Sequence, residues 1–306
     1  MGRCVAFATA LAVVLVIAAT AQANSFPGRN GRIAFTADVA GRSQVFTMRS
    51  NGSGVTQVTR EAAGAADPNW APGGAELVYA RGDGVAALVN PAGALHATVL
   101  TQEPIAEPAL SPDGKRVVFT VNGDGLYDGP SIYVANLDGT GLQRLASGAN
   151  PQWSPNGHWL AYVSVPADTG CSGVRLMQPD GSDDHPVAEG LPDAKEVCHH
   201  GATAPSFSPD SRRVLYVATG IKTPHKANGT DLYTVSIHGG LHTRLTNDDF
   251  AEASPVFSPD GKQVAYERTG GRGRQNGVFT ISAGGAHRHW ISPPHGGLSW
   301  QPLPAG

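Results

Sequence analysis

Residues with carboxylate, amide or hydroxyl side chains recur along this sequence at the same position of a repeated segment, directly before a proline. Carboxylates gathered at one opening of a protein attract a metal cation or a basic peptide segment, because their fields add. The same residue types also accept backbone hydrogen bonds in turns, and this alternative stays open. The five residues before the aligned prolines are Asp67, Glu107, Asn150, Ala204 and Ser254, of which Ala204 is the one without a polar side chain, and Glu252 stands two residues before Ser254.

A pair of cysteines is the second chemical feature. Cys171 and Cys198 remain if the segment that holds Cys4 is removed, and an even pair in an oxidising compartment predicts a disulfide. This bridge would close a loop of about 27 residues and contribute roughly 3 to 4 kcal/mol in the chain-entropy model. The alternative is a metal site of Cys198 with His199 and His200, although the paired spacings of zinc sites are missing.

Enzymatic motifs are weak in this sequence. His287 and His289 are two residues apart on an expected outer strand, so their side chains share one face and could hold a metal with a third ligand. A solvated strand edge is the simpler interpretation. The Gly-x-Ser-x-Gly motif of a hydrolase domain is absent.

Charge and composition exclude several classes of protein. The 306 residues include 22 Lys+Arg and 25 Asp+Glu, a formal net charge of −3 that gives no footprint for nucleic acid or anionic membranes. The 39 Gly and 23 Pro leave little room for long helices. Short clusters of Val, Ile, Leu and aromatic residues argue against a disordered chain. We expect an all-β globular protein.

An internal repeat must position the candidate residues. Five segments align without gaps, and a sixth unit with its anchor at residue 27 and a lone anchor at Trp300 extend the series. The intervals between anchors are 43, 40, 43, 54, 50 and 43 residues, which match propeller blades and not helical solenoids. The aligned segments are Trp-Ala-Pro-Gly-Gly from Trp70, Leu-Ser-Pro-Asp-Gly from Leu110, Trp-Ser-Pro-Asn-Gly from Trp153, Phe-Ser-Pro-Asp-Ser from Phe207 and Phe-Ser-Pro-Asp-Gly from Phe257.

Each anchor is followed by a turn and an apolar triplet whose third member is aromatic, as in Val117-Val118-Phe119. Successive strand residues point to opposite faces, so these triplets predict strands that are buried on both faces. Third strands such as 131–135 and fourth strands such as 142–145 complete four antiparallel strands per unit. The unit that starts at residue 31 lacks an inner strand, and residues 298–301 supply one. We therefore predict a six-bladed β-propeller closed by the N- and C-terminal strands.

The repeat resembles that of TolB-like, WD40-like propellers. The resemblance rests on Ser-Pro-Asp-Gly-x-x-Val-x-Phe/Tyr followed by Ile-Tyr-Val-x-x-x-Asp-Gly, is clearest over residues 110–145 and covers residues 27–301. The Gly-His and Trp-Asp dipeptides of eukaryotic WD40 repeats are missing. TolB itself carries an α/β domain before its propeller, whereas about seven residues separate the expected cleavage site here from the first expected strand. The resemblance implies a periplasmic or secreted binding scaffold.

The first 23 residues read as a secretory signal peptide. Arg3 precedes 15 apolar residues from Val5 to Ala19, and Ala21-Gln22-Ala23 is a small-x-small cleavage site. A retained membrane anchor is the alternative, but 15 residues is short for a spanning helix. We expect residues 24–306 to form a single propeller domain outside the cytoplasm, monomeric and without a membrane span.

These observations predict a non-enzymatic binding scaffold that engages a protein or peptide of the cell envelope, or a small ligand, at the channel mouth. We assign Asp67, Glu107, Asn150, Ser254 and Glu252 to its rim, on separate blades for the three acids, so that no two of those acids need touch. No cofactor is expected, and a channel-bound cation is left open. The alternative is a metal-dependent lyase or hydrolase on the same scaffold.

The cysteine pair gives the first testable prediction. Mass spectrometry of non-reduced tryptic peptides should show Cys171 and Cys198 joined, because both lie in the repeat unit with the longest interval. Two free thiols in protein purified from an oxidising compartment would contradict the bridge and favour the metal alternative.

Overall fold

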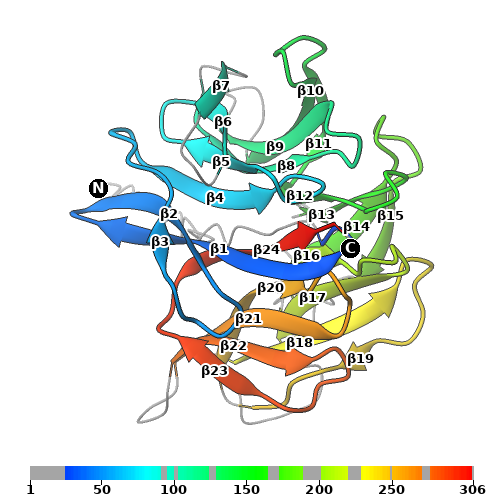
Figure 1. Ribbon diagram of the computed structural model, residues 1–306. Coiled ribbons are helices and arrows are strands. Elements are labelled where there is room, and N and C mark those ends of the chain that lie inside the picture. Colours follow the sequence, from blue (N-terminus) through cyan, green and yellow to red (C-terminus); the bar gives the residue numbers. More distant parts are fainter. Residues whose placement is uncertain are drawn as a thin grey trace, which may run out of the picture.

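The molecule is built from β-strands arranged in a ring (Figure 1). The computed structural model describes residues 25–90, 95–99, 103–123, 129–164, 172–188, 201–219, 229–248, 250–270 and 276–304. The expected signal peptide, both cysteines of the expected disulfide, His199 and His200 lie outside these residues. Within the described ranges, no helix has the length and apolar character needed to cross a membrane.

Six antiparallel sheets of four strands form the blades, as predicted from the repeat. Blade 1 contains β24 (Gly296–Leu303), β1 (Arg29–Val39), β2 (Arg42–Met48) and β3 (Thr56–Gln57); blade 2 contains β4 (Ala65–Trp70), β5 (Leu77–Arg81), β6 (Val85–Val89) and β7 (Leu95–Val99); blade 3 contains β8 (Ile105–Leu110), β9 (Arg116–Asn122), β10 (Pro130–Asn136) and β11 (Gln143–Ser147).

The other three blades follow the same order from the inner to the outer strand. Blade 4 contains β12 (Ala149–Trp153), β13 (Leu160–Ser164), β14 (Gly173–Met177) and β15 (His185–Ala188); blade 5 contains β16 (Ala202–Phe207), β17 (Arg213–Thr219), β18 (Thr230–Ser236) and β19 (Thr243–Arg244); blade 6 contains β20 (Ala251–Phe257), β21 (Gln263–Thr269), β22 (Gly277–Ser282) and β23 (His289–Ser292).

The Ser-Pro-Asp-Gly motif forms the turn between the first two strands of a blade. In blade 3, Ser111 Oγ donates to Asp113 Oδ1 at 2.5 Å and accepts the Arg116 N–H at 2.9 Å. Asp113 Oδ1 also accepts the Lys115 N–H at 3.1 Å, and Gly114 takes a φ of +69°, which glycine tolerates without strain. The same serine–acid or serine–amide pair closes the turns at Ser154 and Asn156, Ser208 and Asp210, and Ser258 and Asp260.

The aromatic anchors and triplets form the core between neighbouring blades. Trp70 of blade 2 is fully buried and belongs to one apolar cluster with Ala34 and Val45 of blade 1. Trp300 likewise packs in a cluster that joins Phe35 of blade 1 to residues of blade 6. Because each sheet buries both faces against its neighbours, a blade cannot be removed without exposing the next one.

The ring closes as predicted, with β24 pairing antiparallel to β1 from Arg29–Leu303 to Thr36–Gly296. The residues before β1 add further ties. Ser25 is fully buried, with its Oγ 3.3 Å from Ser206 Oγ of blade 5, and the Gly28 N–H donates to the Pro259 carbonyl of blade 6 at 3.1 Å. The N-terminal segment therefore fastens blades 5, 6 and 1 together.

The closed ring predicts that the stability of the protein depends strongly on the last strand, β24. Deleting residues 297–306 should leave the protein insoluble or lower its melting temperature sharply, because β1 loses its partner. Trp300→Ala alone should cost about 3 to 5 kcal/mol, since the side chain is fully buried. Trp290→Ala is the matched control, with its residue 41% exposed on β23. An unchanged melting temperature after the deletion would contradict the closed ring.

Candidate functional site

Each inner strand is interrupted at the same place, near the channel axis. The pairing with the second strand shifts register there, and the residue at the shift has a left-handed backbone. Such a conformation costs a non-glycine residue on the order of 1 to 3 kcal/mol, so the surrounding structure must hold it. These residues are the sequence-predicted ones before proline, with φ of 55° at Asp67, 56° at Glu107, 54° at Asn150, 59° at Ala204 and 49° at Ser254, and Gly297 (59°) takes the place in β24.

Side chains at this position form a hydrogen-bonded chain from blade to blade. Thr36 Oγ1 accepts the Asp67 N–H at 3.2 Å, and Asp67 Oδ2 accepts the Glu107 N–H at 3.1 Å. Glu107 Oε2 then accepts the Asn150 N–H at 2.7 Å. The chain joins blades 1 to 4, and it gives both carboxylates the backbone-accepting role that the sequence left open. Asp67 and Glu107 are neighbours, which corrects the expectation that the acids stand apart.

Among the described residues, the side chains at the same position of blades 5 and 6 do not continue this chain. Ala204 offers no side-chain acceptor, and the buried Ser254 Oγ has no hydrogen-bond partner among the described residues. Glu252 is regularly paired with Arg268 of β21, whereas Ser254 lies inside the register shift between Ala253 and Val256. The carboxyl group of Glu252 receives a hydrogen bond from the Thr246 hydroxyl of blade 5. The five expected rim residues therefore occupy two different environments.

Burial changes the charge that these carboxyl groups carry. Glu107 is 2% and Glu252 is 3% exposed. Burial raises the pKa of Glu252 to about 8, so the group is largely uncharged at pH 7. Burial also raises the pKa of Asp67 and Glu107, and for Glu107 the charge of Asp67 adds to the effect. The negative potential expected from three exposed acids is correspondingly weaker.

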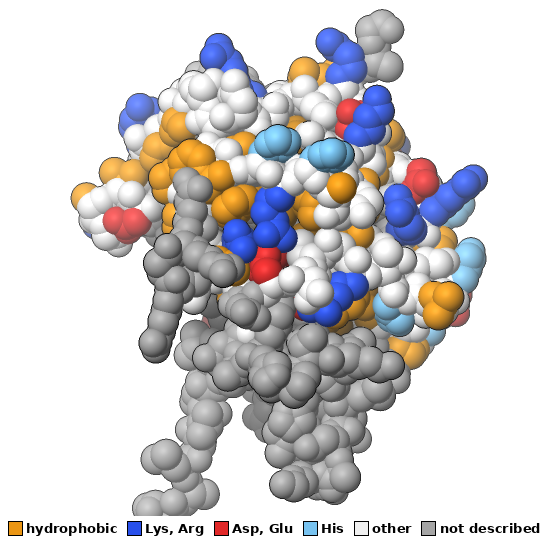
Figure 2. Space-filling model, turned by 90° about the horizontal axis from the view of Figure 1, so that it is seen from below, with side chains coloured by type: hydrophobic (Ala, Val, Ile, Leu, Met, Phe, Trp, Pro, Cys, Tyr) orange, Lys and Arg blue, Asp and Glu red, His pale blue; other side chains and the backbone are white. Residues whose placement is uncertain are grey.

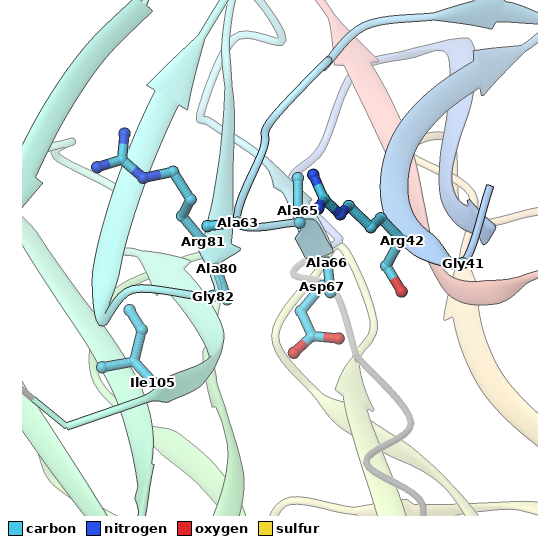
Figure 3. Close-up of a pocket in the computed structure, with 12 residues that line it drawn as sticks. Gly41, Arg42, Ala63, Ala65, Ala66, Asp67, Ala80, Arg81, Gly82 and Ile105 are labelled. Carbon is cyan, nitrogen blue, oxygen red and sulfur yellow. The ribbon is translucent and has the colours of Figure 1, made fainter. Parts of the chain in front are cut away.

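Asp67 lines an open recess (Figure 3). The recess holds about 290 Å³ and lies where the inner strands begin, between blades 1, 2 and 3. Arg42 of β2 and Arg81 of β5 stand on either side of it, and Ile105 of β8 lies below Arg81. Apart from Ser43, the other lining residues are alanines and glycines, which leave the backbone within reach of a ligand.

The charged side chains of the recess differ in the partners that they have within the protein. Arg81 binds Asp83 through two contacts of 2.8 Å, from Nε and Nη2. The Arg42 side chain makes no hydrogen bond or ion pair within the described part of the chain, and one carboxylate oxygen of Asp67 accepts the Glu107 N–H. Sequence reasoning found Asp67 from its place in the repeat. It missed Arg42 and Arg81, because neither occupies a repeated position and only the fold brings them to the mouth.

A larger hollow of about 630 Å³ lies between blades 1 and 6, lined by Phe46, Val55, Trp290 and His295 among others. Burial lowers the pKa of His295, so this mainly apolar hollow offers no charged group. The face drawn in Figure 2 mixes basic, acidic, histidine and apolar side chains without a field of one sign. Among the described residues, no group of three His, Cys, Asp or Glu side chains could hold a metal ion.

The buried pair predicts a pH dependence. Glu107 binds its proton more tightly in the folded than in the unfolded chain, so the free energy of unfolding should fall as pH rises above the ordinary Glu value of 4.5. One proton corresponds to a slope of at most about 1.4 kcal/mol per pH unit. In denaturant melts between pH 5 and pH 8, the unfolding free energy of Glu107→Gln should therefore depend less steeply on pH than that of the wild type. Glu76→Gln, at a partly exposed carboxylate, should keep the wild-type slope, and equal slopes in both variants would contradict the assignment.

Comparisons with known proteins agree with this architecture. No family model matches the chain. Dipeptidyl-peptidase 5 of Porphyromonas endodontalis is 29% identical over 167 residues, covering 51% of this chain and 23% of the peptidase, so the match spans about a quarter of that relative.

Two solved structures resemble most of the described ring. TolB from Acinetobacter baumannii superposes with a TM-score of 0.69 at 21% identity, over 90% of this chain and 68% of that one. An oligogalacturonate lyase in complex with manganese gives a TM-score of 0.61 at 13% identity, over 88% and 76% of the two chains. Together with the six blades and their closure by β1 and β24, these likenesses show that the chain has a TolB-like β-propeller fold.

Proposed function

We propose that the chain is an exported, non-enzymatic binding scaffold that holds a segment of a protein partner at the mouth of its channel. Export is supported by the charged, apolar and small-x-small pattern of residues 1–23. A binding role is supported by the likeness to TolB, a fold-level argument that leaves the partner to be identified.

The recess beside Asp67 is the observation that carries the proposal. It combines an open concave surface, small side chains and charges of both signs, whereas the neighbouring carboxyl of Glu107 is buried in the protein's own hydrogen bonds. Ligand sites commonly pair such a concave surface with a few convergent polar groups. A partner segment can reach Asp67 without displacing a blade, because the recess is already formed.

The enzyme alternative draws support from the peptidase match and from the lyase with manganese. The histidines give it less support. His287 and His289 lie at or just before the outer strand β23 and are exposed, away from the inner strands where a channel site would need its ligands. We therefore keep the metal-dependent lyase or hydrolase as the second proposal.

Site-specific photocrosslinking tests the binding proposal. A photoreactive amino acid at Ala63, an exposed residue of the recess, should give a discrete adduct in the native envelope fraction. The same group at Lys115, an exposed residue on the turn of blade 3, should not. Asp67→Asn should reduce the adduct severalfold, because it removes a charge from the recess. The melting temperature should change little, because the Asn side-chain oxygen can still accept the Glu107 N–H.

Equal adducts from Ala63 and Lys115, or none from either, would contradict partner binding at the mouth. Purified protein that degrades an oligouronate or peptide substrate only when manganese is added would replace the proposal with the enzyme alternative.

A further inference from the structure

We propose that the recess beside Asp67 receives the C-terminal carboxylate of a peptide chain, with Arg42 and Arg81 as its cationic partners. This inference rests on the proposed binding function and specifies its ligand chemistry. Its basis is that two arginine residues line one small hollow from either side (Figure 3).

The arginines provide positive charge that the protein does not fully use. Arg42 is exposed and its side chain contacts no described residue through a hydrogen bond or ion pair, so its five N–H donors are available. Arg81 is bound to Asp83, but that pair is partly exposed, with side-chain exposures of 21% and 48%. An exposed pair contributes little stability, so a ligand carboxylate can share or replace Asp83 at small cost. Arginine binds carboxylates in a forked geometry, which suits this exchange.

Asp67 distinguishes a peptide end from a simple anion. One of its oxygens accepts the Glu107 N–H, and the other has no partner among the described residues. A bare anion would place like charge beside this carboxyl group. A peptide end carries backbone N–H donors behind its carboxylate, so it can donate to Asp67 while its negative charge faces the arginines.

The dimensions and lining favour the end of a chain over a large ligand. The volume of about 290 Å³ lies at the lower limit for small-molecule pockets. Ala65, Ala66 and Ala80 line the recess together with Gly64 and Gly82, so small side chains make up most of its described lining and leave room for a peptide backbone. These residues also offer few apolar contacts, which makes the charged groups the main source of selectivity.

Peptide titration tests the inference directly. Calorimetry with Ala-Ala-Ala should show binding that weakens about tenfold in the C-terminal amide of the same peptide, the scale expected for one lost charge-assisted interaction. Arg42→Ala and Arg81→Ala should each weaken binding of the free acid and leave the amide unaffected. Arg212→Ala, an exposed arginine on the turn between β16 and β17, is the matched control and should change neither. Acetate at the same concentrations should bind far more weakly than the peptide.

Equal affinity for the acid and the amide would overturn carboxylate recognition, while a crosslink from Ala63 would still support partner binding at the mouth. Acetate binding as tightly as the peptide would overturn the peptide end in favour of a small anion. Failure of both peptides to bind, together with no crosslink, would overturn this inference and the proposed function at once.

Discussion

Pairing between the two ends of the chain is the constraint on which the rest of the structure depends. Six blades with apolar faces can bury both sides of every sheet only if the last inner strand returns to the first blade. Strands β1 and β24 meet this requirement, and Ser25 and Gly28 extend the tie to blades 5 and 6. The channel mouth exists because this ring is closed, so the same strand pairing determines the stability of the protein and the geometry of the site.

The ring also explains why its axis carries strained backbone. A left-handed residue at each inner strand lets a side chain reach the backbone of the next blade, as Asp67 does for Glu107. Burial then leaves these carboxyl groups without a cationic partner, which raises their pKa. Most of the acidic residues at the axis therefore serve the architecture. Asp67 belongs to the hydrogen-bonded chain and also lines the recess, so a ligand can reach it.

The fold was predictable because its signals are local and repeated. The Ser-Pro-Asp-Gly turn works through contacts within a few residues, as at Ser111 and Asp113, and it recurs at blade spacing. The site was only partly predictable. The position of Asp67 follows from the repeat, whereas Arg42 and Arg81 stand at unrepeated positions of two blades and line the same recess only in the folded chain. The partner of Glu252 was also hidden, because only the fold brings the Thr246 hydroxyl beside its carboxyl group.

Hydrogen exchange on the full chain, with and without its crosslinked or purified partner, tests the central claim most directly. Binding at the channel mouth should slow exchange at residues 41–43, 63–67 and 80–82, which line the recess. The turns at the other end of the inner strands, such as residues 208–212, should exchange at unchanged rates. Protection confined to those turns or to the outer strands, with the recess unaffected, would contradict the account.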